Sequence, residues 1–319
     1  MDIPTSYTPS NTIAPTLRFH LGTLNVRTLG DSAATSVDEG NHVIARLPIF
    51  VQQLKQANVA ICCLQECRVP EACIIESVEH YVVFCSHATI VRGGRYHGVG
   101  IALKKEWRED VQFWRIISSR LVVLAGCFDG IKIVIICHYA PIMATGEREL
   151  SLNGQMGSCE DHYAALAQVL ADIPLEYCRR FVAGDANAMV GNVDEDIWRL
   201  QLGPYIQDAK WNHNGIHMLN FCFKEGFWVA NSLFDQAANG SGTYRAPGQR
   251  EYSKTLDYIL VRVERREEIT ACFVWPEDGM YAFTDHRMVV ADIEIRQGVT
   301  IRETRYRVGT DIKQEHQQR

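Results

Sequence analysis

The sequence predicts a layered α/β or α+β domain, and three observations lead to this fold class. The chain has 319 residues, of which 47% are hydrophobic, enough to bury a substantial core in one large domain or two small ones. Short apolar, β-branched segments recur along the chain, separated by segments with helical spacing. Most of the short segments are apolar on both faces, which is typical of sheets covered by helices.

The predicted strands begin near Leu17 and continue almost to the end of the chain. Two of them flank Asp129-Gly130, and apolar runs on either side of Asp-Gly predict a hairpin. The full set is 17–25, 59–64, 81–85, 99–103, 121–128, 131–138, 179–183, 256–263, 271–275 and 288–295.

Three segments have helical spacing. The first covers Val43–Gln56, and Pro48 within it means that the helix either starts near Leu47 or is kinked there. The others are 158–171 and 215–225. His213 and His217 have the spacing of a metal pair on a helix, but we expect Asn214-Gly215 to break the helix and both histidines to lie on the surface.

The chain shows no internal repeat and no linker long enough to separate two domains. We therefore expect a flexible leader at 1–16, rich in Ser, Thr and Pro, one domain at 17–295, and a polar tail or linker at 296–319.

Charge and composition narrow the class of protein. The net charge of −6 and pI near 6.0 argue against a nucleic-acid coat protein, which depends on many basic phosphate contacts. An enzyme that holds metal ions with carboxylates can be acidic and still act on phosphates. The sequence has neither the apolar segment of a signal peptide nor a run of about 18 apolar residues. We expect a protein of the nucleus or cytoplasm, not secreted and without a membrane partner.

Polar residues with catalytic chemistry recur at strand ends, where ligands tend to bind. Metal-assisted cleavage of a phosphodiester needs hard oxygen ligands, a base for water and donors for the developing charge, and this set contains all three. The six motifs are Asn25 in 22–29, Glu66 in 63–66, His138-Tyr139-Ala140-Pro141, Asp185 and Asn187 in Gly-Asp-Ala-Asn, Asp257 in Leu-Asp-Tyr, and Asp285-His286 in Thr-Asp-His-Arg.

The order and spacing of these motifs resemble the endonuclease/exonuclease/phosphatase superfamily over about residues 17–295. The resemblance implies a four-layer sandwich, with two mixed β-sheets packed face to face and flanked by helices. Several motifs are similar to the endonuclease domain of LINE-type retrotransposons and their domesticated relatives, among them Leu-Gln-Glu-Cys-Arg and Gly-Asp-Ala-Asn-Ala-Met-Val-Gly. In three places the chain departs from the usual residue, with Ala186 for Phe or Met, Tyr244 for Trp and Thr284 for Ser.

The resemblance also implies a role for each residue. Glu66 would bind Mg²⁺, or Mn²⁺, with help from Asn25 and Asp285. Asp185 would activate water, and Asn187 would hold that water or a phosphate oxygen. His286 would stabilise the transition state, oriented by Asp257. Tyr139 would support the phosphate or the leaving oxygen, and we prefer it to His138, which matches pancreatic deoxyribonuclease, because the Tyr-x-Pro spacing fits the nearer relatives.

The function implied is metal-dependent nicking of DNA that leaves a 3′-hydroxyl, by a monomer. A reverse transcriptase domain in a longer parent protein is a further expected partner. Three alternatives stay open: an abasic-site repair endonuclease, a phosphodiesterase or phosphatase for RNA, inositol or lipid, and an inactive scaffold that only binds.

Overall fold

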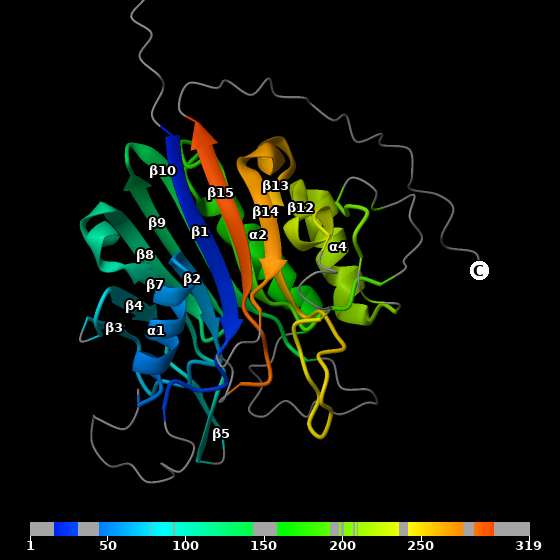
Figure 1. The fold of residues 1–319 in the computed structure, drawn as a ribbon, viewed down its shortest axis with the longest axis horizontal. Helices are drawn as coiled ribbons and strands as arrows, with labels where there is room; N and C mark the ends of the chain where they lie inside the picture. Colours follow the sequence, from blue (N-terminus) through cyan, green and yellow to red (C-terminus); the bar gives the residue numbers. More distant parts are fainter. Residues whose placement is uncertain are drawn as a thin grey trace, which may run out of the picture.

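The computed structural model describes residues 16–30, 45–76, 78–91, 93–142, 158–191, 198, 201–206, 208, 210–235, 242–276 and 284–296. Two large β-sheets lie face to face and helices cover their outer faces, which gives the four layers that the resemblance implies (Figure 1). The predicted leader and tail lie outside the described residues, except for Thr16 and Arg296, which begin the first strand and end the last.

The first sheet has seven strands and is mixed. Strand β1 (Thr16–Asn25) is parallel to β2 (Val59–Gln65) and antiparallel to β15 (Val289–Arg296). The order is β14-β15-β1-β2-β7-β4-β3, and the remaining strands are β14 (Ile269–Val274), β7 (Val99–Lys104), β4 (Tyr81–Cys85) and β3 (Cys73–Ile75).

The second sheet has six strands in the order β12-β13-β11-β10-β9-β8. Its one parallel pair joins β10 (Ile131–Tyr139) to β11 (Arg179–Asp185). A side chain at Gly184 of β11 would place its Cβ 1.9 Å from the carbonyl oxygen of His138, so this close approach requires glycine. The other strands are β12 (Phe227–Val229), β13 (Asp257–Arg262), β9 (Leu121–Phe128) and β8 (Val111–Ser118).

The helices start where their local sequence allows. Helix α1 (Leu47–Gln56) has its proline in the first turn, where the missing N–H costs no hydrogen bond. Helix α2 (Cys159–Asp172) begins with a capping box between Ser158 and Asp161. Short 3₁₀ helices also occur, at η1 (Lys105–Asp110), η2 (Ala230–Leu233) and η4 (Val263–Glu268). Among the described helices, none has the length and apolar character that crossing a bilayer requires.

The prediction that Asn214-Gly215 interrupts a helix is wrong. Helix α4 (His213–Glu225) includes both residues in its first turn, because the side chain of Asn212 caps the helix and accepts the N–H of Gly215 at 2.8 Å. His213 is exposed and His217 is partly exposed, in agreement with the predicted surface position.

Three apolar clusters hold the layers together. One lies between the sheets, a second joins α2 and α4 to the six-stranded sheet, and a third joins α1 to the seven-stranded sheet.

Strands β1, β2, β10 and β11 all end at one edge of the sandwich, where Asn25 of β1 contacts Asp185 of β11. A small hairpin of β5 (Thr89–Val91) and β6 (Gly94–Tyr96) extends from the same edge (Figure 1).

Candidate active site

The predicted site residues converge at this edge on an open groove. Each sheet contributes strand ends, and the parallel pairs β1–β2 and β10–β11 direct those ends the same way. Asn25 and Asp257 lie buried beneath the groove. The predicted residues that line it are Glu66, Tyr139, Asp185, Asn187, Asp285 and His286.

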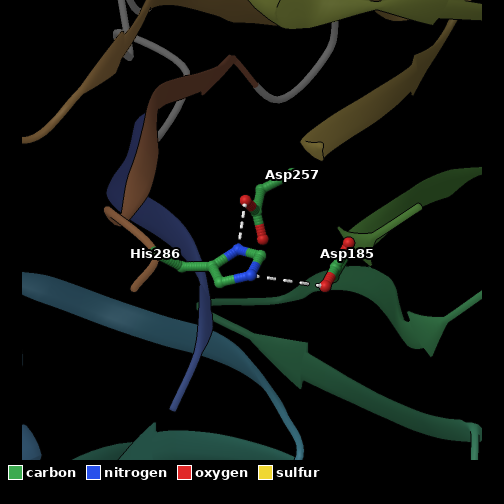
Figure 2. A group of neighbouring side chains, drawn as sticks. All are labelled: Asp185, Asp257 and His286. Carbon is green, nitrogen blue, oxygen red and sulfur yellow. Dashed lines mark hydrogen bonds and ion pairs between the residues drawn. The ribbon is translucent and has the colours of Figure 1, made fainter. Parts of the chain in front are cut away.

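His286 lies between two buried aspartates (Figure 2). Its Nδ1 is 2.8 Å from Oδ2 of Asp257, and its Nε2 is 3.9 Å from Oδ2 of Asp185. Asp257 is completely buried at the start of β13, and Asp185 ends the neighbouring strand β11. With Nδ1 bound to Asp257, the Nε2 side of the ring faces Asp185 and the groove.

The surroundings raise the pKa values of both His286 and Asp185. Burial alone would lower the pKa of His286, but the charge and hydrogen bond of Asp257 and the charge of Asp185 raise it to about 10. Burial and the nearby charge of Asp257 raise the pKa of Asp185 to about 7, against the opposing effects of His286 and Asn25. At neutral pH the imidazole is thus cationic, and Asp185 titrates in the range suited to a general base.

Glu66 is held by three side chains. Its Oε1 accepts hydrogen bonds from Asn25 Nδ2 at 3.1 Å and from the Tyr139 hydroxyl at 3.0 Å, while Oε2 pairs with Arg68. Burial raises the pKa of Glu66, but Arg68 and these donors outweigh it and keep the pKa below its ordinary value. Glu66 is therefore a carboxylate at neutral pH.

Asn25 joins the two halves of the site. Its Nδ2 donates to Asp185 Oδ2 at 2.9 Å as well as to Glu66, and its Oδ1 accepts the backbone N–H of Arg27 at 2.9 Å. Because Asn25 comes from one sheet and Asp185 from the other, this amide fixes their separation.

Asn187 follows Asp185 in a tight turn. Its backbone N–H donates to Asp185 Oδ1 at 2.9 Å, and its Nδ2 donates to the carbonyl of Ala140 at 2.9 Å. The backbone of Asn187 has φ of 47°, a left-handed conformation that asparagine tolerates better than most residues. The turn places the amide at the groove beside Asp185.

No family model matches the chain, but similar proteins are known. Craniofacial development protein 2 from Bos taurus is 22% identical over 285 residues, which are 89% of this chain and 42% of that protein. The chain thus spans less than half the length of this curated relative.

Three solved structures show the same architecture. A 3′ phosphatase, NExo, from Neisseria bound to a product DNA hairpin has a TM-score of 0.58 and 16% identity, over 86% of this chain and 99% of that one. An endonuclease/exonuclease/phosphatase family protein from Leptotrichia buccalis has a TM-score of 0.54 and 14% identity, over 87% and 100%. The endonuclease domain of TRAS1, a telomere-specific non-LTR retrotransposon, has a TM-score of 0.52 and 12% identity, over 87% and 98%.

This chain has the endonuclease/exonuclease/phosphatase fold. The resemblance predicted from the order of the motifs is confirmed, and the retrotransposon endonuclease among the structural neighbours agrees with the predicted subgroup.

The donor set at the groove fits a hard divalent cation. Among the described residues, the polar atoms of Asp185, Asp257 and His286 lie within 4.8 Å of one another, but a cationic His286 has no lone pair for a metal, so the carboxylates are the ligands that this group offers. Oδ1 of Asp257 is buried there without a hydrogen-bond partner among the described atoms. Glu66 and Asp285 add carboxylates at the groove, and carboxylate oxygens are ligands that Mg²⁺ and Mn²⁺ prefer.

This group differs from the predicted metal set of Glu66, Asn25 and Asp285. Asp285 lies 3.7 Å from Arg27, and the oxygen of Asn25 is engaged by the backbone. The assignment of metal ligands stays a prediction.

Tyr139 and His138, the two candidates for contact with the phosphate, lie on opposite faces of β10. Tyr139 lines the groove, whereas His138 points to the other face of the sheet and lies 3.3 Å from His162 of α2, between Nδ1 and Nε2. The structure therefore places Tyr139 beside Glu66 and excludes His138 from the groove.

Arg120, which precedes β9, was not predicted from the sequence. Its guanidinium lies over the Tyr139 ring at 4.8 Å and donates to the carbonyls of Tyr139 and Ala140, both at 3.2 Å. Its Nη2 is 2.8 Å from His97 Nε2, at the base of the β5–β6 hairpin. These contacts fix the position of Tyr139.

Three further residues that line the groove were not predicted from the sequence, namely Arg27, Arg68 and Trp211. A signal existed for the two arginines, since each follows a predicted metal ligand by two residues, in Asn-Val-Arg and Glu-Cys-Arg. Trp211 has no such signal.

Proposed function

We propose that this protein is a divalent-metal-dependent phosphodiesterase that nicks DNA and leaves a 3′-hydroxyl. The observation that carries the proposal is the buried Asp257–His286–Asp185 arrangement beside Glu66 in an open groove. The arrangement offers a base with a pKa near 7 and a cationic donor in one place, which hydrolysis of a phosphodiester requires.

In this proposal Asp185 takes a proton from the attacking water, and Asn187 orients that water or a phosphate oxygen. His286 donates from Nε2 to a non-bridging phosphate oxygen, and Asp257 holds the ring by Nδ1. The hydroxyl of Tyr139 supports the phosphate or the leaving oxygen, next to Glu66.

Glu66, assisted by Asp285 and Asn25, would hold Mg²⁺ or Mn²⁺, which supplies positive charge to the phosphate when bound. In the present contacts Asn25 acts on the site by holding Glu66 and Asp185 side by side.

Charge at the groove supports a phosphate backbone as substrate. Arg27, Arg68 and Lys254 line the groove although the chain is acidic overall. The NExo structure contains a DNA hairpin, and TRAS1 is a retrotransposon, so DNA cleavage of the retrotransposon kind is the function we favour. Action in the nucleus, within a longer protein that includes a reverse transcriptase domain, belongs to the same proposal.

The test is nicking of supercoiled plasmid with Mg²⁺, with EDTA, and by Asp185→Ala. The matched control is Glu267→Gln, which changes an exposed carboxylate outside the groove lining. We expect open circles only with metal, from wild type and control, and a loss of at least about 10²-fold in the variant. A near wild-type rate for Asp185→Ala would overturn the site.

An intact plasmid in every arm would exclude intact DNA as the substrate. Abasic duplex, RNA and small phosphoesters would then separate the remaining phosphodiesterase activities from a protein that only binds.

A further inference from the structure

Apolar side chains line the groove among its charged residues. Ile142, Met189 and Trp211 line it, and we call these three residues the Trp211 shelf. Trp211 is 51% exposed and Ile142 is 52% exposed, an unusual state for large apolar side chains that lie in a groove. Neither the predicted cleavage chemistry nor the core packing uses them.

The tryptophan is held in place by its neighbour Asn212. The Asn212 side chain accepts the N–H of Met189 at 2.9 Å and donates to the carbonyl of Asn187 at 3.0 Å. The Asn212 backbone N–H also donates to the carbonyl of Met189 at 3.1 Å, and Trp211 forms a β-bridge with Val190. The shelf is therefore anchored to the segment that follows Asp185, the proposed base.

This position decides what the shelf can bind. A phosphodiester under attack at Asp185 brings its own nucleosides to the groove, so the nearest apolar part of the substrate is a nucleobase. An exposed indole ring binds the flat face of a base by stacking. In a regular duplex both faces of each base are covered by neighbouring bases, so only a base that has left its stack can use the shelf.

We propose that the Trp211 shelf binds an unstacked nucleobase next to the phosphodiester that is cleaved. This inference rests on the proposed function and adds a substrate class to it, namely DNA with an unpaired or single-stranded nucleotide at the cleavage position. Arg27, Arg68 and Lys254 of the same groove would contact the backbone on either side.

The test measures binding without chemistry. The full chain is titrated in EDTA against two fluorescein-labelled oligonucleotides, a fully paired duplex and the same duplex with one bulged nucleotide. The variants are Trp211→Ala and Trp211→Phe. The matched control is Tyr205→Ala, which removes an aromatic side chain that is 43% exposed and lies outside the groove lining.

We expect wild type to bind the bulged duplex more tightly than the paired one. Trp211→Ala should weaken binding to the bulged duplex by about 5- to 150-fold and leave the paired duplex nearly unchanged, as the usual strength of base–aromatic stacking implies. Trp211→Phe should keep most of the preference because the ring is retained, and Tyr205→Ala should keep all of it.

Two results would overturn the shelf. They are an undiminished preference in Trp211→Ala, and an equal affinity of wild type for both duplexes. The plasmid assay separates this failure from failure of the proposed function, because metal-dependent nicking that requires Asp185 would stand even if Trp211→Ala behaved as wild type. Conversely, a Trp211-dependent preference in EDTA would establish the shelf in a protein that cut nothing.

Discussion

At the scale of single residues, the two carboxylates beside His286 decide both the tautomer and the charge of its ring. A buried imidazole beside one carboxylate gains a fixed tautomer, and beside two it also becomes a stable cation. Burial and the charge of Asp257 nevertheless raise the pKa of Asp185 to about 7, because both oppose ionisation of its carboxyl group. Asp257 thus acts on both partners although it lies beneath the groove.

Asp257→Asn should reduce nicking by roughly 10²-fold at pH 8 and move the alkaline limit of activity to lower pH. The pKa of His286 is raised to about 10, mainly through Asp257, so the cation persists over the whole neutral range. Without that charge, burial lowers the pKa and the cation is lost as pH rises. Rates between pH 5.5 and 9.5 measure this, with Glu267→Gln as the control. An unchanged pH profile in Asp257→Asn would refute the assignment.

Arg120→Ala should lower kcat by roughly tenfold with a smaller effect on KM, since one hydrogen-bonded support of the site is lost. Arg120 fixes Tyr139 through the ring contact and two carbonyls and does not itself line the groove. Arg120→Lys keeps the charge but not the planar contact, so its rate should fall between the two. Steady-state kinetics of nicking on an intact, labelled duplex oligonucleotide measures both constants, and an effect confined to KM would instead indicate a phosphate contact.

At the scale of elements, the contact between β10 and α2 contains a buried histidine pair. Burial lowers the pKa of His138 to about 4, and burial together with the nearby His138 lowers the pKa of His162 well below its ordinary value. Both rings are therefore neutral in the folded protein, whereas in the unfolded chain they take up protons below about pH 6.5.

This pair predicts a loss of stability in mild acid. The free energy of unfolding is highest above about pH 6.5, where both rings are neutral in the folded and the unfolded chain. It decreases as the pH falls toward 4, and at pH 5 the decrease is about 2 kcal/mol for His138 alone. Urea unfolding at pH 7.5 and 5.0 measures it. His138→Gln should show a smaller difference between the two pH values, and the exposed His213→Gln should not. Equal acid sensitivity in all three proteins would contradict the explanation.

Most long elements could be predicted from the sequence because their faces are uniformly buried. The ends of the β9–β10 hairpin, β4 and α2 lie within one residue of the predicted bounds. Strand β8 was missed because it is nowhere fully buried, so its sequence lacks the apolar run that identified the others. The short strands β3, β5, β6 and β12 have three residues each, too few to show a periodic apolar pattern, and are defined by their pairing.

The convergence of the predicted residues on one groove was predictable for a related reason. Its eight predicted residues lie at the ends of strands, and strand ends carry a local signature. Arg120 and Trp211 were not predictable, because each acts through contacts with a remote segment. Arg120 contacts Tyr139 across a hairpin, and Trp211 depends on the pairing of Asn212 with the Asn187–Met189 turn.

At the scale of the whole molecule, the two sheets bring several carboxylates together at one groove, where protein cations offset part of their charge. Glu66 follows β2 of one sheet, and Asp185 and Asp257 belong to the other. Asp285 reaches the same groove from the loop before β15. Binding of a divalent cation should therefore stabilise the packing of the two sheets as well as serve the reaction.

Mg²⁺ at about ten times its dissociation constant should stabilise the folded protein by about 1.4 kcal/mol, a rise of a few degrees in Tm. Glu66→Gln should abolish most of this shift, and Glu267→Gln should retain it. Differential scanning fluorimetry with and without EDTA provides the measurement, which is independent of activity. The same shift in Glu66→Gln as in wild type would exclude Glu66 as a ligand.

The pairing of the first strand with the last has a consequence for how this domain can be joined to other sequences. Thr16 lies opposite Arg296 in the β1–β15 ladder, so their Cα atoms are about 5 Å apart. This point is at the far pole of the sandwich from the groove, since β1 runs from Thr16 to Asn25 (Figure 1). The whole domain could thus be inserted into a surface loop of a host protein through two adjacent linkers, with the groove facing away from the host.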